Sequence, residues 1–199
     1  RSRTVKEGKT ITQQIHLIRE EVHRSDRIIT DLMGFAQLAE GSVEPLNIPE
    51  EMDQALEQVF PEAANFKMKI ERDYAPALPK VFMQRGHFNE IMVNILQNAR
   101  EAIPENCKIK LTASAGEGYS ILVTIEDSGP GMSQELLDQI FEPYFTTKEK
   151  GTGLGLAIVR HNVEIYGGHL KVESQLGEGT KFILQFPART LIKLQRNPG

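Results

Sequence analysis

The chain has 199 residues, of which 40% are hydrophobic and 25% charged, and its formal net charge at pH 7 is -4. This acidic balance gives no indication of nucleic-acid binding, and the single cysteine, Cys107, excludes an internal disulfide and a cysteine metal cluster. There is no apolar run of about 18 residues and no signal-peptide pattern, so we expect a soluble, cytoplasmic chain.

Residues 10–41 have the spacing of one long amphipathic helix that ends at Gly41. Gaps of four and three residues alternate over four heptads at Ile11, Ile15, Ile18, Val22, Ser25, Ile29, Leu32, Ala36 and Ala39. Extra apolar residues beside this seam favour a helical bundle over a two-stranded coil. Because a single helix with one apolar stripe is unstable in water, we expect self-association, as a homodimer, through residues 10–41.

The stretch GSVEPLNIPEE is rich in turn-forming residues and is interpreted as the linker to a second unit. We expect three units: a dimerisation-type helix at 1–42, a larger domain at 43–187 and a C-terminal tail at 188–199. In the larger domain, periodicity predicts helices at 50–59, 85–103, 133–139 and 153–166, and strands at 66–72, 107–114, 119–126, 168–174 and 180–187.

Several of these strands alternate apolar and polar residues, as Ile121, Val123 and Ile125 do. One face of the sheet is therefore expected to be apolar and covered by helices. The predicted fold class is α+β: a two-layer α/β sandwich whose mixed, mostly antiparallel sheet has helices on one face.

Three glycines occupy every second position at the start of GTGLGLAIVR, residues 151–160, directly ahead of an apolar run with helical spacing. A glycine-rich turn that leads into a helix presents free N–H groups and the positive end of the helix dipole, which suits a phosphate. The spacing differs from the G-x-G-x-x-G of dinucleotide folds, and no P-loop lysine follows. Phosphate binding here requires another fold, and a plain helix cap is the alternative.

The stretch HFNEIMVNILQNAREAI places Asn94 and Asn98 four residues apart on one helix face. Glu90 and Glu101 lie on roughly the same side of this helix. Taken alone, the two asparagines are more simply explained as solvated surface amides.

The stretch IEDSGPGM ends a strand at Asp127 and turns through Gly129 and Gly131. Taken alone, such a sequence is most often a simple turn. A carboxylate at a strand end can also accept a hydrogen bond from the exocyclic amine of adenine, and neighbouring glycines let the backbone approach the base.

Two more stretches follow these: FEPYFTTKEKGTGLGLAIV and GGHLKVESQLGEGTKFILQFP. In their order and spacing, the four stretches together resemble the N, G1, F and G2 boxes and the closing strand pair of sensor histidine kinases. The resemblance to this ATP-binding domain covers residues 43–187. Residues 10–41 resemble the second helix of the family's dimerisation domain. The FEPYFTTKEKGTGLGL stretch, which matches the family's ATP lid, and the NAREA box are most similar to the nitrogen-sensing and dicarboxylate-sensing branch.

The resemblance implies ATP and Mg²⁺ as cofactors. It assigns adenine to Asp127 and Mg²⁺ to Asn98, with Asn94 supporting the metal and phosphates and Lys148 placed on the terminal phosphate. The implied catalytic residues are Asn94, Lys148 and Glu90. The further nucleotide-binding residues that it implies are Glu101, Gly129, Gly131, Thr147, Thr152, Gly153, Leu154, Gly155, Leu156 and Thr180.

The function implied is transfer of the γ-phosphoryl group to a histidine and then to an aspartate of a response-regulator receiver domain. None of the five histidines has the sequence context of the family's phosphoacceptor. The chain also begins at Arg1 without an initiator methionine. We therefore expect either a fragment, attached to a membrane only through segments outside it, or an enzyme that phosphorylates another chain.

Two other functions are considered. An ATP-driven clamp of the gyrase, chaperone or mismatch-repair type carries a glutamate where this chain has Asn94, so Glu90, one turn away, would have to activate water. A non-catalytic module that binds ATP to regulate a partner is consistent with the missing acceptor.

Overall fold

The computed structural model describes residues 41–61, 69–102, 108–148 and 151–188. The helix expected over residues 10–41 and the C-terminal tail lie almost wholly outside these ranges, so both stay predictions. Within the described residues, no helix has the length and hydropathy needed to cross a membrane.

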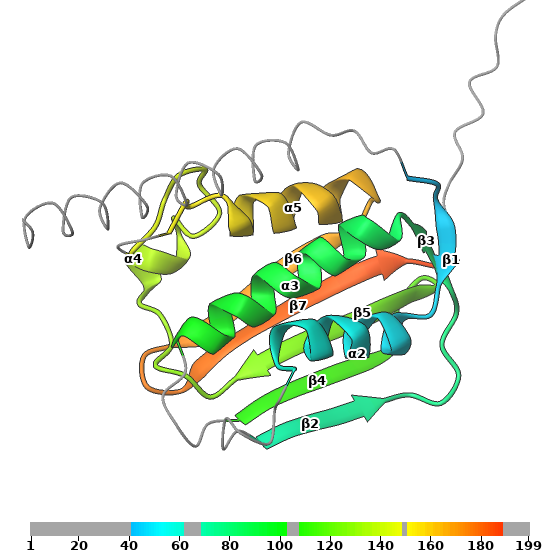
Figure 1. Ribbon diagram of the computed structural model, residues 1–199, viewed down its shortest axis with the longest axis horizontal. Helices are drawn as coiled ribbons and strands as arrows, with labels where there is room; N and C mark the ends of the chain where they lie inside the picture. The colour runs from blue at the N-terminus through cyan, green and yellow to red at the C-terminus, as the bar shows by residue number, and fades with distance from the viewer. Residues whose placement is uncertain (1–40, 62–68, 103–107, 149–150, 189–199) are drawn as a thin grey trace, which may run out of the picture.

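A five-stranded sheet in the order β2-β4-β5-β7-β6 forms one layer of the fold (Figure 1). Its strands are β2 (Lys69–Tyr74), β4 (Lys108–Gly116), β5 (Ser120–Asp127), β6 (His169–Gln175) and β7 (Gly179–Pro187). β2 and β4 pair in parallel, whereas the other neighbours are antiparallel. The expectation of a mixed, mostly antiparallel sheet is confirmed.

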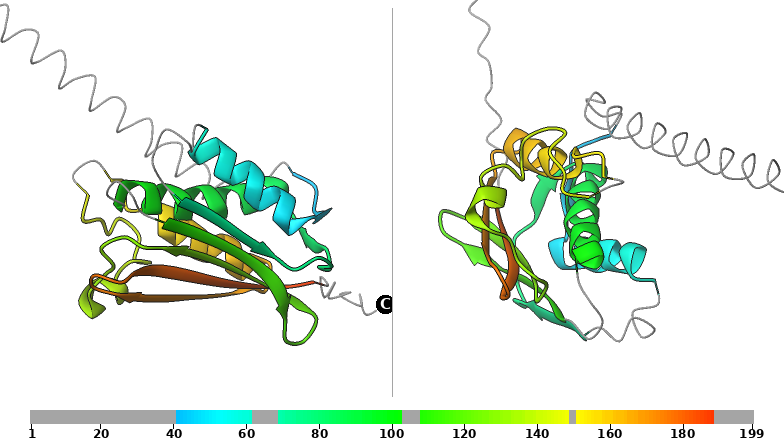
Figure 2. Two further views of the ribbon diagram at one scale, coloured as in Figure 1. Left: turned by 90° about the horizontal axis from the view of Figure 1, so that it is seen from below. Right: turned by 90° about the vertical axis from the view of Figure 1, so that its left-hand side faces the viewer.

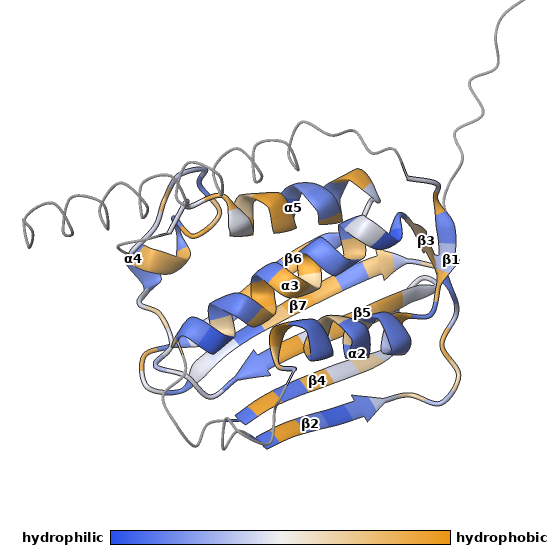
Figure 3. Cartoon of the chain, in the orientation of Figure 1, coloured by the Kyte–Doolittle hydropathy of each residue, from blue (hydrophilic) through white to orange (hydrophobic). Residues whose placement is uncertain are grey.

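Helices α2 (Ile48–Val59), α3 (Arg85–Ala102) and α5 (Gly155–Ile165) cover one face of this sheet (Figures 1 and 2). Apolar residues alternate with polar ones along the strands and recur along the helices (Figure 3). The core forms where these faces meet, and Phe88 of α3 packs edge-to-face on Phe186 of β7 with ring centroids 6.0 Å apart. The two-layer sandwich is therefore confirmed.

Two short strands, β1 (Glu44–Leu46) and β3 (Val81–Met83), form a separate antiparallel sheet. Sequence periodicity missed both, because three residues are too few to show alternation. β1 also contains Pro45, a residue tolerated chiefly at sheet edges.

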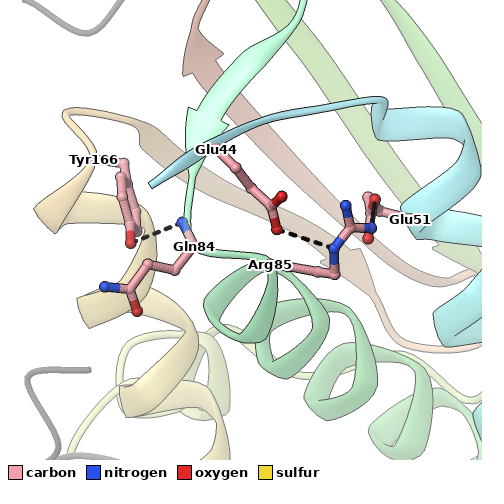
Figure 4. Close-up of polar contacts among 5 residues, drawn as sticks. All are labelled: Glu44, Glu51, Gln84, Arg85 and Tyr166. Atoms are coloured by element: carbon pink, nitrogen blue, oxygen red, sulfur yellow. Dashed lines mark hydrogen bonds and ion pairs between the residues drawn. The ribbon is translucent and has the colours of Figure 1, made fainter. Parts of the chain in front are cut away.

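Polar contacts tie this small sheet to the helices (Figure 4). Arg85, at the start of α3, donates from Nε to Glu44 Oε1 at 3.1 Å and also binds the buried carboxylate of Glu51 on α2. The hydroxyl of Tyr166, just after α5, accepts a hydrogen bond from the Gln84 N–H at 3.2 Å. The N-terminal end of α3 is thereby bound to β1, α2 and the end of α5.

Element boundaries differ from the predicted ones by a few residues. α5 begins at Gly155 rather than at 153, because Gly153 has φ +71°, which lies outside the helical region. β2 continues to Tyr74, two residues past its expected end, where Arg72 and Tyr74 can both donate to Asp53 Oδ1 on α2. α4 is only Gln134–Leu137, capped by Ser133.

Candidate functional site

A cavity of about 530 Å³ lies between the C-terminal half of α3, the loop after β5 and the segment that leads into α5. Stretches that are far apart in the sequence meet at its wall. Of the residues predicted for the site, those that line the cavity are Asn94, Asn98, Glu101, Asp127, Gly131, Thr147, Lys148, Thr152, Gly153, Gly155, Leu156 and Thr180.

The α3 wall is polar and regularly spaced. Asn94, Asn98 and Glu101 follow one another by four and three residues, so their side chains share one side of the helix. Gln97 also lines the cavity and was missed, although its spacing of three from Asn94 could have found it. This side of α3 therefore presents three amides and one carboxylate.

The Asn94 amide is held between α3 and the start of α5. Its Nδ2 donates to the main-chain oxygen of Glu90 at 2.9 Å, one turn earlier on the same helix. A Cβ added at Gly155 would lie 2.6 Å from Asn94 Oδ1, closer than a normal contact. The absence of a side chain at Gly155 is therefore needed for the observed approach of the amide to the N-terminus of α5.

Gly153, two residues before α5, pairs closely with the backbone of Tyr144. The Tyr144 N–H donates to the Gly153 oxygen at 2.9 Å, and a Cβ on Gly153 would lie 2.4 Å from the Tyr144 carbonyl carbon. Arg160 of α5 lies over the ring of Phe141, 5.9 Å from its centroid. We call residues 141–148 and 151–153 the lid; Phe141, at its start, contacts α5, and Tyr144 pairs with Gly153 at its end.

Lys148, on the lid, contacts α3. Its Nζ donates to Asn98 Oδ1 at 2.7 Å and to Glu101 Oε2 at 2.5 Å. The amide oxygen and the carboxylate thus bind one positive charge at the cavity wall.

Asp127, at the end of β5, is a carboxylate with only 8% of its surface exposed. Burial raises its pKa, while the backbone N–H groups of Gly129 and Thr180 act in the opposite direction. The Gly129 N–H donates to Asp127 Oδ1 at 2.8 Å, and Thr180 lies opposite Asp127 on β7. The acceptor is therefore held in a fixed orientation at the inner end of the cavity.

Three predicted site residues do not line the cavity. Gly129 contributes only through its bond to Asp127, and Leu154 is buried. Glu90 is directed toward α5, where its Oε2 accepts a hydrogen bond from Asn162 Nδ2 at 2.8 Å. Asn162 itself was not considered from the sequence, because its helical position gives no signal of a polar partner.

Several apolar side chains of the cavity wall were missed by sequence reasoning. They include Met132, Leu136, Ile140, Phe145 and Phe182. A flat apolar ring fits between such side chains with its polar edge at Asp127, as is usual for ligand pockets. The opposite, polar end offers amides, an ammonium and a helix N-terminus, which suits phosphates.

The donor set also fits a hard cation at this polar end. Asn98 Oδ1 and Glu101 Oε2 already bind an ammonium, and oxygen ligands of these two kinds are accepted by Mg²⁺. No cluster of three or more His, Cys, Asp or Glu suited to a metal occurs in the described part of the chain. A metal at this position would therefore take further ligands from phosphates and water.

Residues 83–190 match the family of histidine kinase-, DNA gyrase B- and HSP90-like ATPases. The sensor histidine kinase ZraS of Escherichia coli K12 is 31% identical over 90% of this chain and 38% of its own length. Sporulation kinase E of Bacillus subtilis 168 is 29% identical over 92% of this chain and 25% of its own length. The chain thus spans well under half the length of these relatives.

Solved histidine kinases have the same fold. The nucleotide-free catalytic domain of ThkA has a TM-score of 0.66 and 32% identity, covering 74% of this chain and 96% of that domain. Full-length ShkA, solved with AMPPNP, has a TM-score of 0.75 and 30% identity, covering 88% of this chain and 38% of ShkA. ThkA in complex with the response regulator TrrA has a TM-score of 0.72 and 27% identity, covering 91% of this chain and 52% of that ThkA chain.

Proposed function

This chain belongs to the family of histidine kinase-, DNA gyrase B- and HSP90-like ATPases, and we propose that it is the catalytic, ATP-binding part of a sensor histidine kinase. The observation that carries the proposal is the cavity in which Asp127, the α3 amides and the lid lysine meet. Its two ends have the different chemistries that an adenine and a triphosphate require.

Adenine binds at the buried end. The Asp127 carboxylate accepts a hydrogen bond from the exocyclic amine, and guanine has a carbonyl at that place, which cannot donate. Because Gly129 fixes Asp127 Oδ1, the acceptor does not need to reorganise when the base enters. The apolar side chains around it exclude water and strengthen this contact.

The phosphates bind at the polar end, beside Asn94, Lys148 and the backbone N–H groups at the start of α5. Asn98, with Glu101 beside it, would hold Mg²⁺. A metal held there would supply positive charge to neutralise the phosphates. Phosphoryl transfer asks the protein mainly for positioning and charge neutralisation, and these residues supply both.

The phosphoryl group passes to a histidine rather than to water. A hydrolysing clamp ATPase needs a general base beside the terminal phosphate, and Asn94 cannot act as one. Glu90 is bound to Asn162 and does not line the cavity, which argues against its serving as that base. Slow hydrolysis is the consequence.

The partners proposed are a histidine-bearing helical domain, a response-regulator receiver domain and a second copy of the chain. The ThkA complex with TrrA supports the second of these by analogy. The helix predicted at residues 10–41 is the element proposed for self-association.

Radiolabelled ATP tests this function. The chain should transfer label from the γ-phosphate to an added dimerisation domain that carries its histidine, and the product should be acid-labile. Asn98→Ala should abolish labelling. Rapid hydrolysis without the added domain would instead indicate a clamp ATPase, and tight ATP binding with no labelling would indicate a regulatory module.

A further inference from the structure

Lys148 brings together two oxygen atoms of α3 around one positive charge. Its ammonium nitrogen lies 2.7 Å from Asn98 Oδ1 and 2.5 Å from Glu101 Oε2. All three side chains line the cavity. The amide and the carboxylate are therefore already arranged to share a single cation.

Mg²⁺ prefers the same ligands. It is a hard cation that binds carboxylate and amide oxygens together with phosphates and water. A carboxylate adds the negative charge that the neutral Asn98 amide lacks. Glu101 is thus better suited to the cation than to the phosphates, which it would repel.

We propose that Glu101 and Asn98 form one cation position that the Lys148 ammonium and the Mg²⁺ of the bound nucleotide occupy in turn. The inference rests on the proposed function, because it concerns the metal that accompanies ATP. When Mg²⁺ takes this position, Lys148 is released from α3 and becomes available to the terminal phosphate. Mg²⁺ and the Lys148 ammonium therefore exchange at one position, and metal binding is coupled to the release of the lid lysine from α3.

The exposure of the ion pair is consistent with such an exchange. The side chains of Lys148 and Glu101 are 40% and 57% exposed, so solvent screens their attraction. A screened ion pair is weak enough for a divalent cation with phosphate ligands to displace it. For the same reason, we expect the competition to change metal binding severalfold rather than by orders of magnitude.

The test is a calorimetric titration of the chain with a non-hydrolysable ATP analogue at a series of free Mg²⁺ concentrations. The quantity compared is the Mg²⁺ midpoint, defined as the Mg²⁺ concentration that gives half of the full gain in nucleotide affinity. Lys148→Met removes the competing ammonium and should lower the midpoint about two- to fivefold. Adding Glu101→Gln to Lys148→Met should raise it again by a similar factor, because the carboxylate ligand is lost.

A second exposed ion pair provides matched controls. Lys171 and Glu173 on β6 are 2.7 Å apart and lie outside the cavity. Lys171→Met and the double variant Lys171→Met with Glu173→Gln remove the same charges and should leave the Mg²⁺ midpoint unchanged. Thermal unfolding of every variant establishes that it is folded.

Three results would overturn the inference. An unchanged or raised midpoint in Lys148→Met would show that the ammonium does not compete with Mg²⁺. Equal midpoints in Lys148→Met and the double variant with Glu101→Gln would exclude Glu101 as a ligand. If the unmodified chain bound no analogue at any Mg²⁺ concentration, the proposed function itself would fail, and this inference would fail with it.

Discussion

At the scale of single residues, Asp127 has an environment that favours ligand binding over stability. Burial of its carboxylate raises its pKa, and hydrogen bonds from two backbone N–H groups only partly offset that cost. A polar acceptor held this way is positioned for a ligand that donates a hydrogen bond. The same residue is predicted to determine the choice of base.

Asp127→Ala should weaken binding of a non-hydrolysable ATP analogue by roughly 1.5 to 3 kcal/mol, or about ten- to a hundredfold, because a charge-assisted hydrogen bond is lost. Calorimetry measures the affinity. Glu126→Ala, the exposed neighbour on the same strand, is the control and should bind normally. Unchanged affinity in a folded Asp127→Ala protein would remove this residue from the site.

His87 is a titratable group away from the cavity. Its Nδ1 lies 2.8 Å from the Tyr166 hydroxyl, and burial lowers its pKa below 6.5, helped by nearby His161 and opposed by Glu90. Well above pH 6.5 the ring is neutral in both folded and unfolded chains. As the pH falls below this value, the unfolded chain takes up the proton first, which lowers the free energy of unfolding. This loss continues until the pH has fallen through the lower pKa of the folded state.

We therefore expect the free energy of unfolding to fall between pH 7.5 and 5.5, and to fall less in His87→Gln. Partial exposure limits the difference to less than about 1 kcal/mol. Urea denaturation at several pH values measures it. His169→Gln, at an exposed position on β6, should retain the full pH dependence. An identical profile in His87→Gln would contradict the assignment.

At the scale of elements, the site depends on how closely α3 and α5 approach. Asn94 on α3 and Gly155 at the start of α5 meet where phosphates are proposed to bind. The helix N-terminus can contribute its N–H groups only if no side chain separates it from that amide. The packing of two helices and the chemistry of the site are therefore linked at a single position.

Gly155→Ala should reduce affinity for the ATP analogue about tenfold, since its Cβ would lie 2.6 Å from Asn94 Oδ1 and displace the amide. Calorimetry again reports the change. Gly86→Ala in the first turn of α3 is the matched substitution, because no atom lies within 4 Å of the added Cβ. It should leave affinity unchanged and stabilise the fold by about 0.5 to 1 kcal/mol.

Equal nucleotide affinity in Gly155→Ala and Gly86→Ala would mean that the α3–α5 approach is unimportant for binding. Loss of folding in Gly155→Ala alone is not expected, because alanine is a better helix former than glycine and its clash is with a side-chain end.

At the scale of the whole molecule, the prediction concerns assembly. The seam over residues 10–41 lies outside the described residues apart from Gly41. Its apolar spacing requires a partner surface, and we expect the intact chain to form a dimer through it. The boundary between this unit and the domain from residue 43 likewise stays a prediction.

Ile29→Glu should weaken self-association by at least about tenfold, because it would bury an unpaired charge in an apolar layer. Sedimentation velocity of the unmodified chain and the variant measures this. His23→Glu, at an outer heptad position, should stay dimeric, and both variants should bind the ATP analogue normally. A monomeric unmodified chain would refute the prediction.

The sequence alone determined most of the fold and much of the site. Periods of 3.6 and 2 residues are local properties, so α3, α5 and the long strands could be predicted from short windows. Helical spacing likewise placed Asn94 and Asn98 on one face of α3, and both line the cavity. Each of these features depends on residues close together in the chain.

Tertiary structure decided the rest, because it concerns partners that are far apart in the sequence. β1 and β3 are stable only as a pair across more than thirty residues, so neither has a local signal. The Glu90 carboxylate is directed to Asn162, away from the cavity, by the packing of α5 on α3. Lys148 binds Glu101 and Asn98 because the lid meets α3 at these two residues. Helical spacing carries no information about where the lid meets the helix.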